Sequence, residues 1–176
     1  TLGVQWQWNA NPQAGWYSLA SRPGHLRMPV AAFPETKGYV RAAPNILTQK
    51  LPATVFTVDT RIALQNAADG DRAGLILNGQ TYAALGLRKQ GGALQLVYTV
   101  CEPVKPRCQE ADAVLLPKAP AILSLRMTMA EGAQARFFYS VDGKDFKPAG
   151  APFAATKGHW VGAQMGLYAA SDAARA

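Results

Sequence analysis

The chain has 176 residues, of which 49% are hydrophobic and 16% charged, and its net charge at pH 7 is +7. This length suits one domain with a substantial core, and no stretch approaches the roughly 20 consecutive apolar residues of a membrane-spanning helix. The basic residues come singly or in pairs, without the stripe that follows a phosphate backbone, which argues against a nucleic-acid partner. An evenly basic surface instead favours solubility, or weak attraction to acidic polymers such as wall polysaccharide that bears glucuronic acid.

Alternation of apolar and polar residues dominates the chain, and helical periodicity is nearly absent. Near the N-terminus, Val4, Trp6 and Trp8 share one side of a strand pattern, while Gln5 and Gln7 point to the other. Further alternating segments follow at residues 25–28, 54–64, 82–88, 94–99 and 123–129. Each predicts a half-buried antiparallel strand, with one face on a core and the other in water.

Turn signals separate these strands. Asp142-Gly143 predicts a hairpin because glycine tolerates the positive φ of a primed turn, and Gln90-Gly91-Gly92 and Asp69-Gly70-Asp71 are similar in kind. The spacing predicts ten to thirteen strands without βαβ alternation, and hence an all-β fold, either a two-sheet sandwich or a barrel. We expect one domain over residues 1–170 and a frayed tail over residues 171–176.

Cys101 and Cys108 are the only cysteines, and two prolines lie in the six-residue segment between them. A bent loop end favours a local disulfide, which would place the protein in the periplasm or outside the cell; the alternative is two reduced thiols. A zinc site is not expected, because the distant His25 and His159 lack the spacing of zinc ligands.

Catalysis by carboxylates is not indicated. A glycosidase needs two or three carboxylates in a cleft at a defined separation, and two close acidic pairs, Asp69 with Asp71 and Asp142 with Asp145, both lie in glycine-bearing turns. We interpret both pairs as turn formers that accept hydrogen bonds from the backbone.

Two further kinds of site stay open as alternatives. A polysaccharide lyase uses a Tyr or His base beside a charge-neutralising Arg or Gln, which His25 near Arg27, with Gln5 and Gln7, would imitate. No cofactor is expected, although a structural calcium remains an alternative. Its candidate ligands, which lack EF-hand spacing, are Asp69, Asp71, Asp142 and Asp172.

A sugar site needs aromatic rings to stack on pyranose CH faces, and planar polar groups to bind vicinal hydroxyls. Strand alternation assigns Trp6 and Trp8 to the core, but Trp16 and Tyr17 cannot both be buried, and Trp160 follows a Gly-His pair at a loop-to-strand transition. Alternation turns Gln5, Gln7, His25, Arg27, Tyr82 and Arg88 toward solvent. If the strands that carry them are neighbours in one sheet, the exposed face of that sheet is suited to carbohydrate; the alternative is an ordinary solvated face. The candidate carbohydrate-binding residues are Gln5, Gln7, Trp16, Arg27, Tyr82, Arg88 and Trp160.

Eight segments, in collinear order, together resemble one family. They are LGVQWQWN (2–9), NP (11–12), RPGHLR (22–27), NILTQK (45–50), GDRAGL (70–75), YAALGLRK (82–89), FFYSVDGKDF (137–146) and WVGAQMGL (160–167). The sequence resembles the C-terminal concanavalin-A-like domain of bacterial glycoside hydrolase family 43 enzymes, the β-xylosidases and α-arabinofuranosidases. The resemblance implies an antiparallel jelly-roll sandwich behind a five-bladed catalytic propeller, and in some members a sandwich loop shapes the active-site pocket.

The leading hypothesis is therefore a non-catalytic accessory domain of a xylan- or arabinoxylan-degrading enzyme, which binds plant cell-wall polysaccharide or buttresses an upstream catalytic propeller. The opening Thr1-Leu2-Gly3, without Met or signal peptide, suggests a piece of a longer polypeptide. The alternatives are a jelly-roll lyase or glycosidase active by itself, and a stand-alone lectin.

Overall fold

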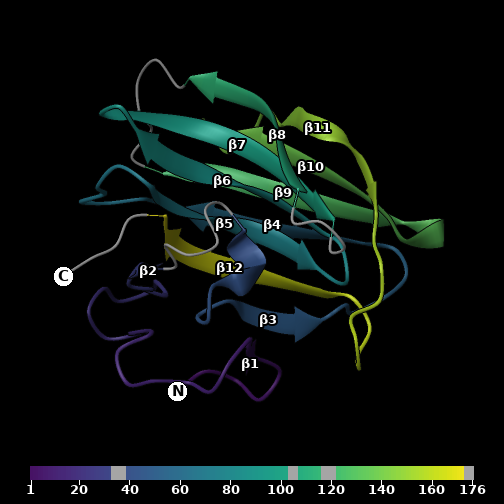
Figure 1. Cartoon of the computed structure of the whole chain (residues 1–176), viewed down its shortest axis with the longest axis horizontal. Coiled ribbons are helices and arrows are strands. Elements are labelled where there is room, and N and C mark those ends of the chain that lie inside the picture. Colours follow the sequence, from purple (N-terminus) through teal and green to yellow (C-terminus); the bar gives the residue numbers. More distant parts are fainter. Residues whose placement is uncertain (33–38, 103–106, 116–121, 173–176) are drawn as a thin grey trace.

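The computed structural model describes residues 1–32, 39–102, 107–115 and 122–172, with the backbone alone at 102 and 107–115. These residues form two stacked, essentially antiparallel sheets (Figure 1). The larger sheet runs in the order β1 (Gln7–Trp8), β3 (Leu47–Lys50), β12 (Gln164–Ser171), β5 (Asp71–Asn78), β6 (Tyr82–Gln90), β7 (Ala93–Glu102) and β8 (Arg107–Leu115). The short β2 (Ala31–Ala32) pairs with β12 in parallel. The smaller sheet runs in the order β11 (Lys147–Ala154), β10 (Gln134–Ser140), β9 (Leu123–Ala130) and β4 (Phe56–Ile62).

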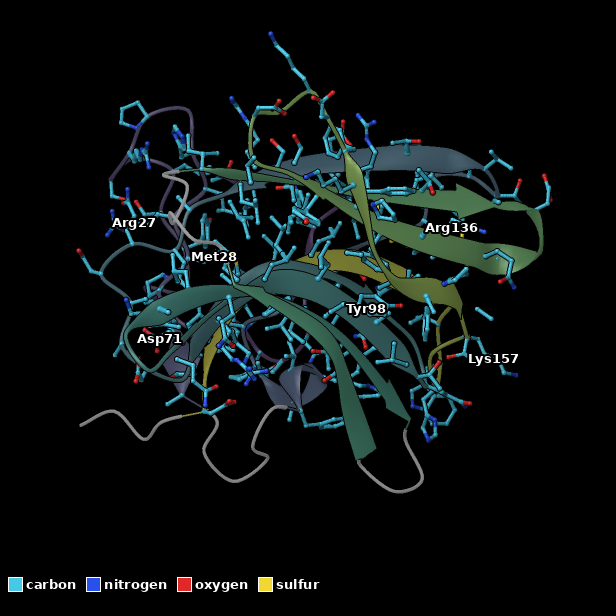
Figure 2. All side chains as sticks on the ribbon, turned by 90° about the horizontal axis from the view of Figure 1, so that it is seen from above. Arg27, Met28, Asp71, Tyr98, Arg136 and Lys157 are labelled. Carbon is cyan, nitrogen blue, oxygen red and sulfur yellow. The ribbon has the colours of Figure 1, made fainter. Side chains whose placement is uncertain are left out.

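The main core fills the space between the two sheets. In the central strands alternate residues point inward, as Leu85 and Leu87 of β6 and Met127 of β9 do, and these three are fully buried. Tyr98 of β7 lies between the layers (Figure 2) with its ring 5.6 Å from that of Phe137 on β10. The predicted all-β sandwich is confirmed: period-2 alternation creates two apolar faces that only stacking can remove from water.

The predicted strands 54–64 and 123–129 correspond to β4 and β9. Their inward residues are buried or half-buried, while Asp59 and Arg126 pair directly across the wet face. The Arg126 guanidinium donates two hydrogen bonds of 2.7 and 2.8 Å to the Asp59 carboxylate, and it lies 3.9 Å from the centre of the Phe146 ring. These hydrogen bonds lower the pKa of Asp59.

A second core covers the outer face of the larger sheet. The segment 39–46, which includes a short 3-10 turn η2 (Val40–Ala42), lies over β5, β6 and β12. Tyr82 is fully buried beneath it, and the Val40 amide donates a 2.9 Å hydrogen bond to the Tyr82 hydroxyl. The expectation that Tyr82 lies on a wet face is wrong, because strand alternation cannot reveal that another segment covers the second face.

The predicted turns fall into two kinds. Gly91 and Gly92, with φ of 57° and 77°, form a two-residue hairpin between β6 and β7. Gly143, with φ of 75°, lies in the connection between the antiparallel strands β10 and β11, as expected. The Asp69-Gly70-Asp71 turn is different, because it leads from β4 in one sheet to β5 in the other and forms no hairpin.

Both ends of the chain differ from expectation. In the segment 3–8 only Gln7 and Trp8 form a strand, and Val4 is fully exposed rather than on an apolar face. The segment 25–28 alternates in burial but is tied to a neighbour only by a bridge between Ser18 and Arg27.

At the C-terminal end, β12 extends through the buried Ser171, and the Asp172 amide bonds to the Gly70 carbonyl. Order therefore continues two residues past the expected boundary, and residues 173–176 lie outside the described part. Among the described helical turns, none has the length and apolarity to cross a bilayer.

Candidate functional site

The seven candidate carbohydrate-binding residues do not share one face. Tyr82 is buried, and Arg88 is half-buried and donates a 3.0 Å hydrogen bond to the Gln95 side chain on the neighbouring strand. The other candidates lie in four places: the β1 edge, an aromatic cluster, a pocket and the loop that carries Trp160.

An exposed amide ladder crosses the β1 edge of the larger sheet. The Gln164 side-chain amide of β12 donates to the Gln7 side-chain oxygen at 2.9 Å. Thr48 of β3 lies between them, and its hydroxyl donates to the Gln7 carbonyl at 3.2 Å. Gln5 is exposed just before β1. Such planar groups can bind adjacent sugar hydroxyls. Gln164 is absent from the sequence-derived set because Gln7 and Gln164 are 157 positions apart and only sheet pairing joins them.

Trp160 lies in the loop 155–163 that leads directly into Gln164. Its side chain is 93% exposed, and its neighbour Val161 is 50% exposed. The His159 ring meets the Trp160 ring edge-on, with 6.0 Å between their centres. Trp160 and Val161 therefore leave apolar surface in water and take no part in the core.

Trp16 belongs to a half-buried cluster with Trp8 and Tyr17. The ring of Trp8 lies 5.3 Å from that of Trp16 and 5.9 Å from that of Tyr17. Edge-to-face contact of this kind stabilises packing of the N-terminal segment on β1. Trp16 is therefore half-buried and packs against Trp8, rather than standing free at the surface.

Arg27 lines a pocket of about 360 Å³ at one end of the sandwich. The segment 22–30 forms one wall, the end of β4 and residues 63–65 form another, and β5 and β12 form the floor. Figure 2 shows Arg27 and Met28 at this end and Arg136 toward the opposite end. His25 also lines the pocket, but Gln5 and Gln7 do not, so the lyase-like grouping of these residues does not form.

Asp69, Asp71 and Asp142 accept backbone hydrogen bonds in their turns, as predicted. The Asp69 carboxylate accepts hydrogen bonds from the amides of Gly91 and Gly92, at 2.9 and 3.2 Å. Asp142 accepts from the Ser140 hydroxyl and the amides of Lys144 and Asp145, and these bonds lower its pKa to about 2. Within the described ranges, no three His, Cys, Asp or Glu side chains gather as a metal site would require.

The backbone register places Cys101 of β7 directly opposite Cys108 of β8. Cys101 is buried, whereas the side chain of Cys108 lies outside the described part. Direct pairing across two antiparallel strands brings the Cα atoms within the range that a disulfide spans. The disulfide itself stays a prediction.

Comparison with known proteins decides the family. The protein-family model described as the C-terminal concanavalin A-like domain of β-xylosidase matches residues 1–176. The chain belongs to this family. A β-xylosidase of Formosa agariphila is 28% identical over 97% of the chain, and a putative β-xylosidase of Xylanibacter ruminicola is 29% identical over 94%. The chain spans about a third of the length of these relatives, 31% and 28% respectively.

Solved structures agree with the fold. A bifunctional family 43 protein of Bacteroides eggerthii matches 98% of this β-xylosidase C-terminal domain with a TM-score of 0.86 and 26% identity, over 22% of its own length. A family 43 protein of Bacillus licheniformis matches 99% of the chain with a TM-score of 0.81 and 22% identity, over 35% of its length. The concanavalin-A-like sandwich and the resemblance to family 43 enzymes are thereby confirmed.

Proposed function

We propose that the chain is a non-catalytic accessory domain of a xylan- or arabinoxylan-degrading enzyme, in which it packs beside a catalytic propeller and binds polysaccharide. The observation that carries this proposal is the match of the whole chain to a domain defined as C-terminal in β-xylosidases, together with relatives about three times as long. The acidic pairs add support, because the carboxylates of Asp69 and Asp142 are each engaged by backbone amides of turns.

The polysaccharide site that we propose joins Trp160 to the amide ladder of Gln7 and Gln164. The exposed indole offers a face for stacking on a xylose ring, and the Gln164 amide, four residues further along the chain, offers hydrogen bonds to its hydroxyls. The same loop, with Trp160 and Val161, also suits contact with a neighbouring domain, because both side chains leave apolar surface in water.

Titration of the chain with xylo-oligosaccharides, followed by tryptophan fluorescence and calorimetry, tests the binding role. We expect binding by the wild type and a loss of about fivefold or more in affinity for Trp160→Ala, since stacking on an aromatic ring contributes on the order of 1 kcal/mol. Val141→Ala, which trims an exposed apolar residue in a different loop, is the control. If the wild type binds no xylan or xylo-oligosaccharide, the polysaccharide role fails and the packing role alone survives.

The absence of catalysis is tested separately on the same chain. Incubation with aryl xylosides, aryl arabinosides and a polysaccharide panel is expected to release neither sugar nor unsaturated products. Reducing ends, or a rise in ultraviolet absorbance, would instead favour the glycosidase or lyase alternative.

We also propose that the protein is exported to the periplasm or beyond, because a Cys101–Cys108 disulfide persists in oxidising compartments. The facing register of β7 and β8 supports this proposal.

A further inference from the structure

The pocket beside Arg27 is distinct from the Trp160 surface and is lined by basic groups. Its lining residues include three arginines and one histidine, namely Arg22, His25, Arg27 and Arg61. His25, Arg27 and Arg61 are exposed, so their side chains lie at the rim of the pocket rather than in its interior. None of the described residues that line it is acidic. The carboxylate nearest to Arg61 along β4 is that of Asp59. It already accepts two hydrogen bonds from the Arg126 guanidinium. The pocket therefore presents positive charge that its described walls do not balance.

About half of the pocket lining is apolar. Leu26 and Met28 from the segment 22–30 face it from one side, Leu64 from the other, and Leu167 from the β12 floor. Its volume of about 360 Å³ falls in the range of small-ligand sites, roughly 300–1,000 Å³. Thr60 and Gln65 add a hydroxyl and an amide to the lining. A ligand that fills this site needs a carboxylate or similar anion, an apolar face and hydroxyl groups.

We propose that this pocket binds a hexuronic acid residue of an acidic polysaccharide. The carboxylate pairs with the guanidinium groups of Arg27 and Arg61, which offer bidentate hydrogen bonds. The CH face of the pyranose ring lies against Leu26 and Met28, and the hydroxyls reach Thr60 and Gln65. A neutral pentose has no carboxylate to pair with the arginines, and inorganic phosphate has no apolar face to pack against the aliphatic side chains.

Because the pocket and the Trp160 surface are different sites, this assignment does not rest on the proposed function. Trp160→Ala is expected to leave uronate binding unchanged, and arginine substitutions in the pocket are expected to leave xylo-oligosaccharide binding unchanged. A failure of one site is thus distinguishable from a failure of the other.

The test is a calorimetric titration of the 176-residue chain with sodium glucuronate, and separately with glucose, xylose and inorganic phosphate. We expect glucuronate to bind at least tenfold more tightly than any of the other three, and added salt to weaken its binding. The double variant Arg27→Gln with Arg61→Gln is expected to reduce glucuronate affinity by tenfold or more. Both arginines are exposed, so the variant should keep the wild-type melting temperature.

Arg136→Gln is the matched control, because it removes one exposed arginine from β10, away from the pocket. Its glucuronate affinity is expected to stay within about twofold of the wild type. Equal binding of phosphate and glucuronate would reduce the site to unspecific anion attraction. That result would overturn the proposal. The proposal would also fail if the double variant bound glucuronate as tightly as the wild type, or if the wild type bound no glucuronate.

Discussion

Asp142 shows how a single carboxylate can serve structure rather than chemistry. Its oxygen accepts three hydrogen bonds within the connection between β10 and β11, and these bonds lower its pKa to about 2 from the usual 3.8. A carboxyl whose pKa is depressed by folding stabilises the protein above its unfolded pKa and loses that contribution as pH falls through the folded value. The relevant window is therefore between about pH 4 and pH 2.

The first prediction follows from this window. Asp142→Ala should lower the free energy of unfolding at pH 7, and the gap to the wild type should close as the pH falls from about 4 to about 2. Urea denaturation at a series of pH values measures both curves. Asp145→Ala, in the same connection, is the control and should lower stability less at pH 7. A gap that persists unchanged at pH 2 would contradict the prediction.

Gly86 permits a close approach within the larger sheet. A Cβ at this position would collide with the Tyr168 hydroxyl and with the Ala73 carbonyl of the adjacent strand. Gly86→Ala should therefore destabilise the protein by about 1–3 kcal/mol, as overpacking typically does. Gly162→Ala is the control, since a Cβ there meets open space and its φ is not in the left-handed region. Thermal unfolding of both variants measures the difference; equal melting temperatures would contradict it.

At the scale of elements, the segment 39–46 converts the outer face of β6 from a wet surface into a core. The hydrogen bond from the Val40 amide to the Tyr82 hydroxyl fastens η2 to the sheet, and burial raises the pKa of that hydroxyl. Tyr82→Phe leaves a buried amide unpaired, so stability should fall by about 1–3 kcal/mol. Sugar binding should be unaffected, because Tyr82 is not at the surface.

The matched control for this prediction is Tyr139→Phe on β10, a half-buried tyrosine. Its expected loss is smaller than that of Tyr82→Phe, as measured by chemical denaturation. A loss of sugar affinity in the Tyr82 variant, with unchanged stability, would restore the sequence-based interpretation of a binding tyrosine.

The hairpin of β7 and β8 carries the predicted disulfide. Closure of its short loop should stabilise the protein by roughly 2 kcal/mol through the unfolded state. A thiol count under denaturing, non-reducing conditions is expected to find no free thiol, and reduction should lower the melting temperature. Two reactive thiols before reduction would rule the disulfide out and remove its support for export.

At the scale of the whole molecule, the two sheets share one core. Leu85 and Leu87 of the larger sheet belong to the same buried cluster as Met127 and Phe137 of the smaller sheet. Neither apolar face is stable in water alone, so we expect a single cooperative unfolding transition. Calorimetry should give equal calorimetric and van't Hoff enthalpies. Two separate transitions would show that the sheets, or the covering segment 39–46, unfold independently.

The family and the strand pattern were predictable because both depend on local or collinear sequence. The alternation in β4 and β9 indicates directly that one face of each strand is buried, and Gly91 and Gly92 indicate a tight turn. The binding set was only partly predictable. Trp160 was among the expected residues and is exposed, whereas Trp16 is packed against Trp8.

The sequence by itself determined the all-β class, the main turns and the membership of the β-xylosidase C-terminal family, since these follow from period-2 alternation and ordered motifs. Only the tertiary structure decided where the outer face of a sheet is covered by another segment, as it is over Tyr82. It also decided which distant residues meet, as Gln7 and Gln164 do. It also gathered Arg22, Arg27 and Arg61 around one pocket. The physical reason is that alternation is a property of neighbours in the chain, whereas coverage and adjacency depend on how strands far apart in sequence pair and stack.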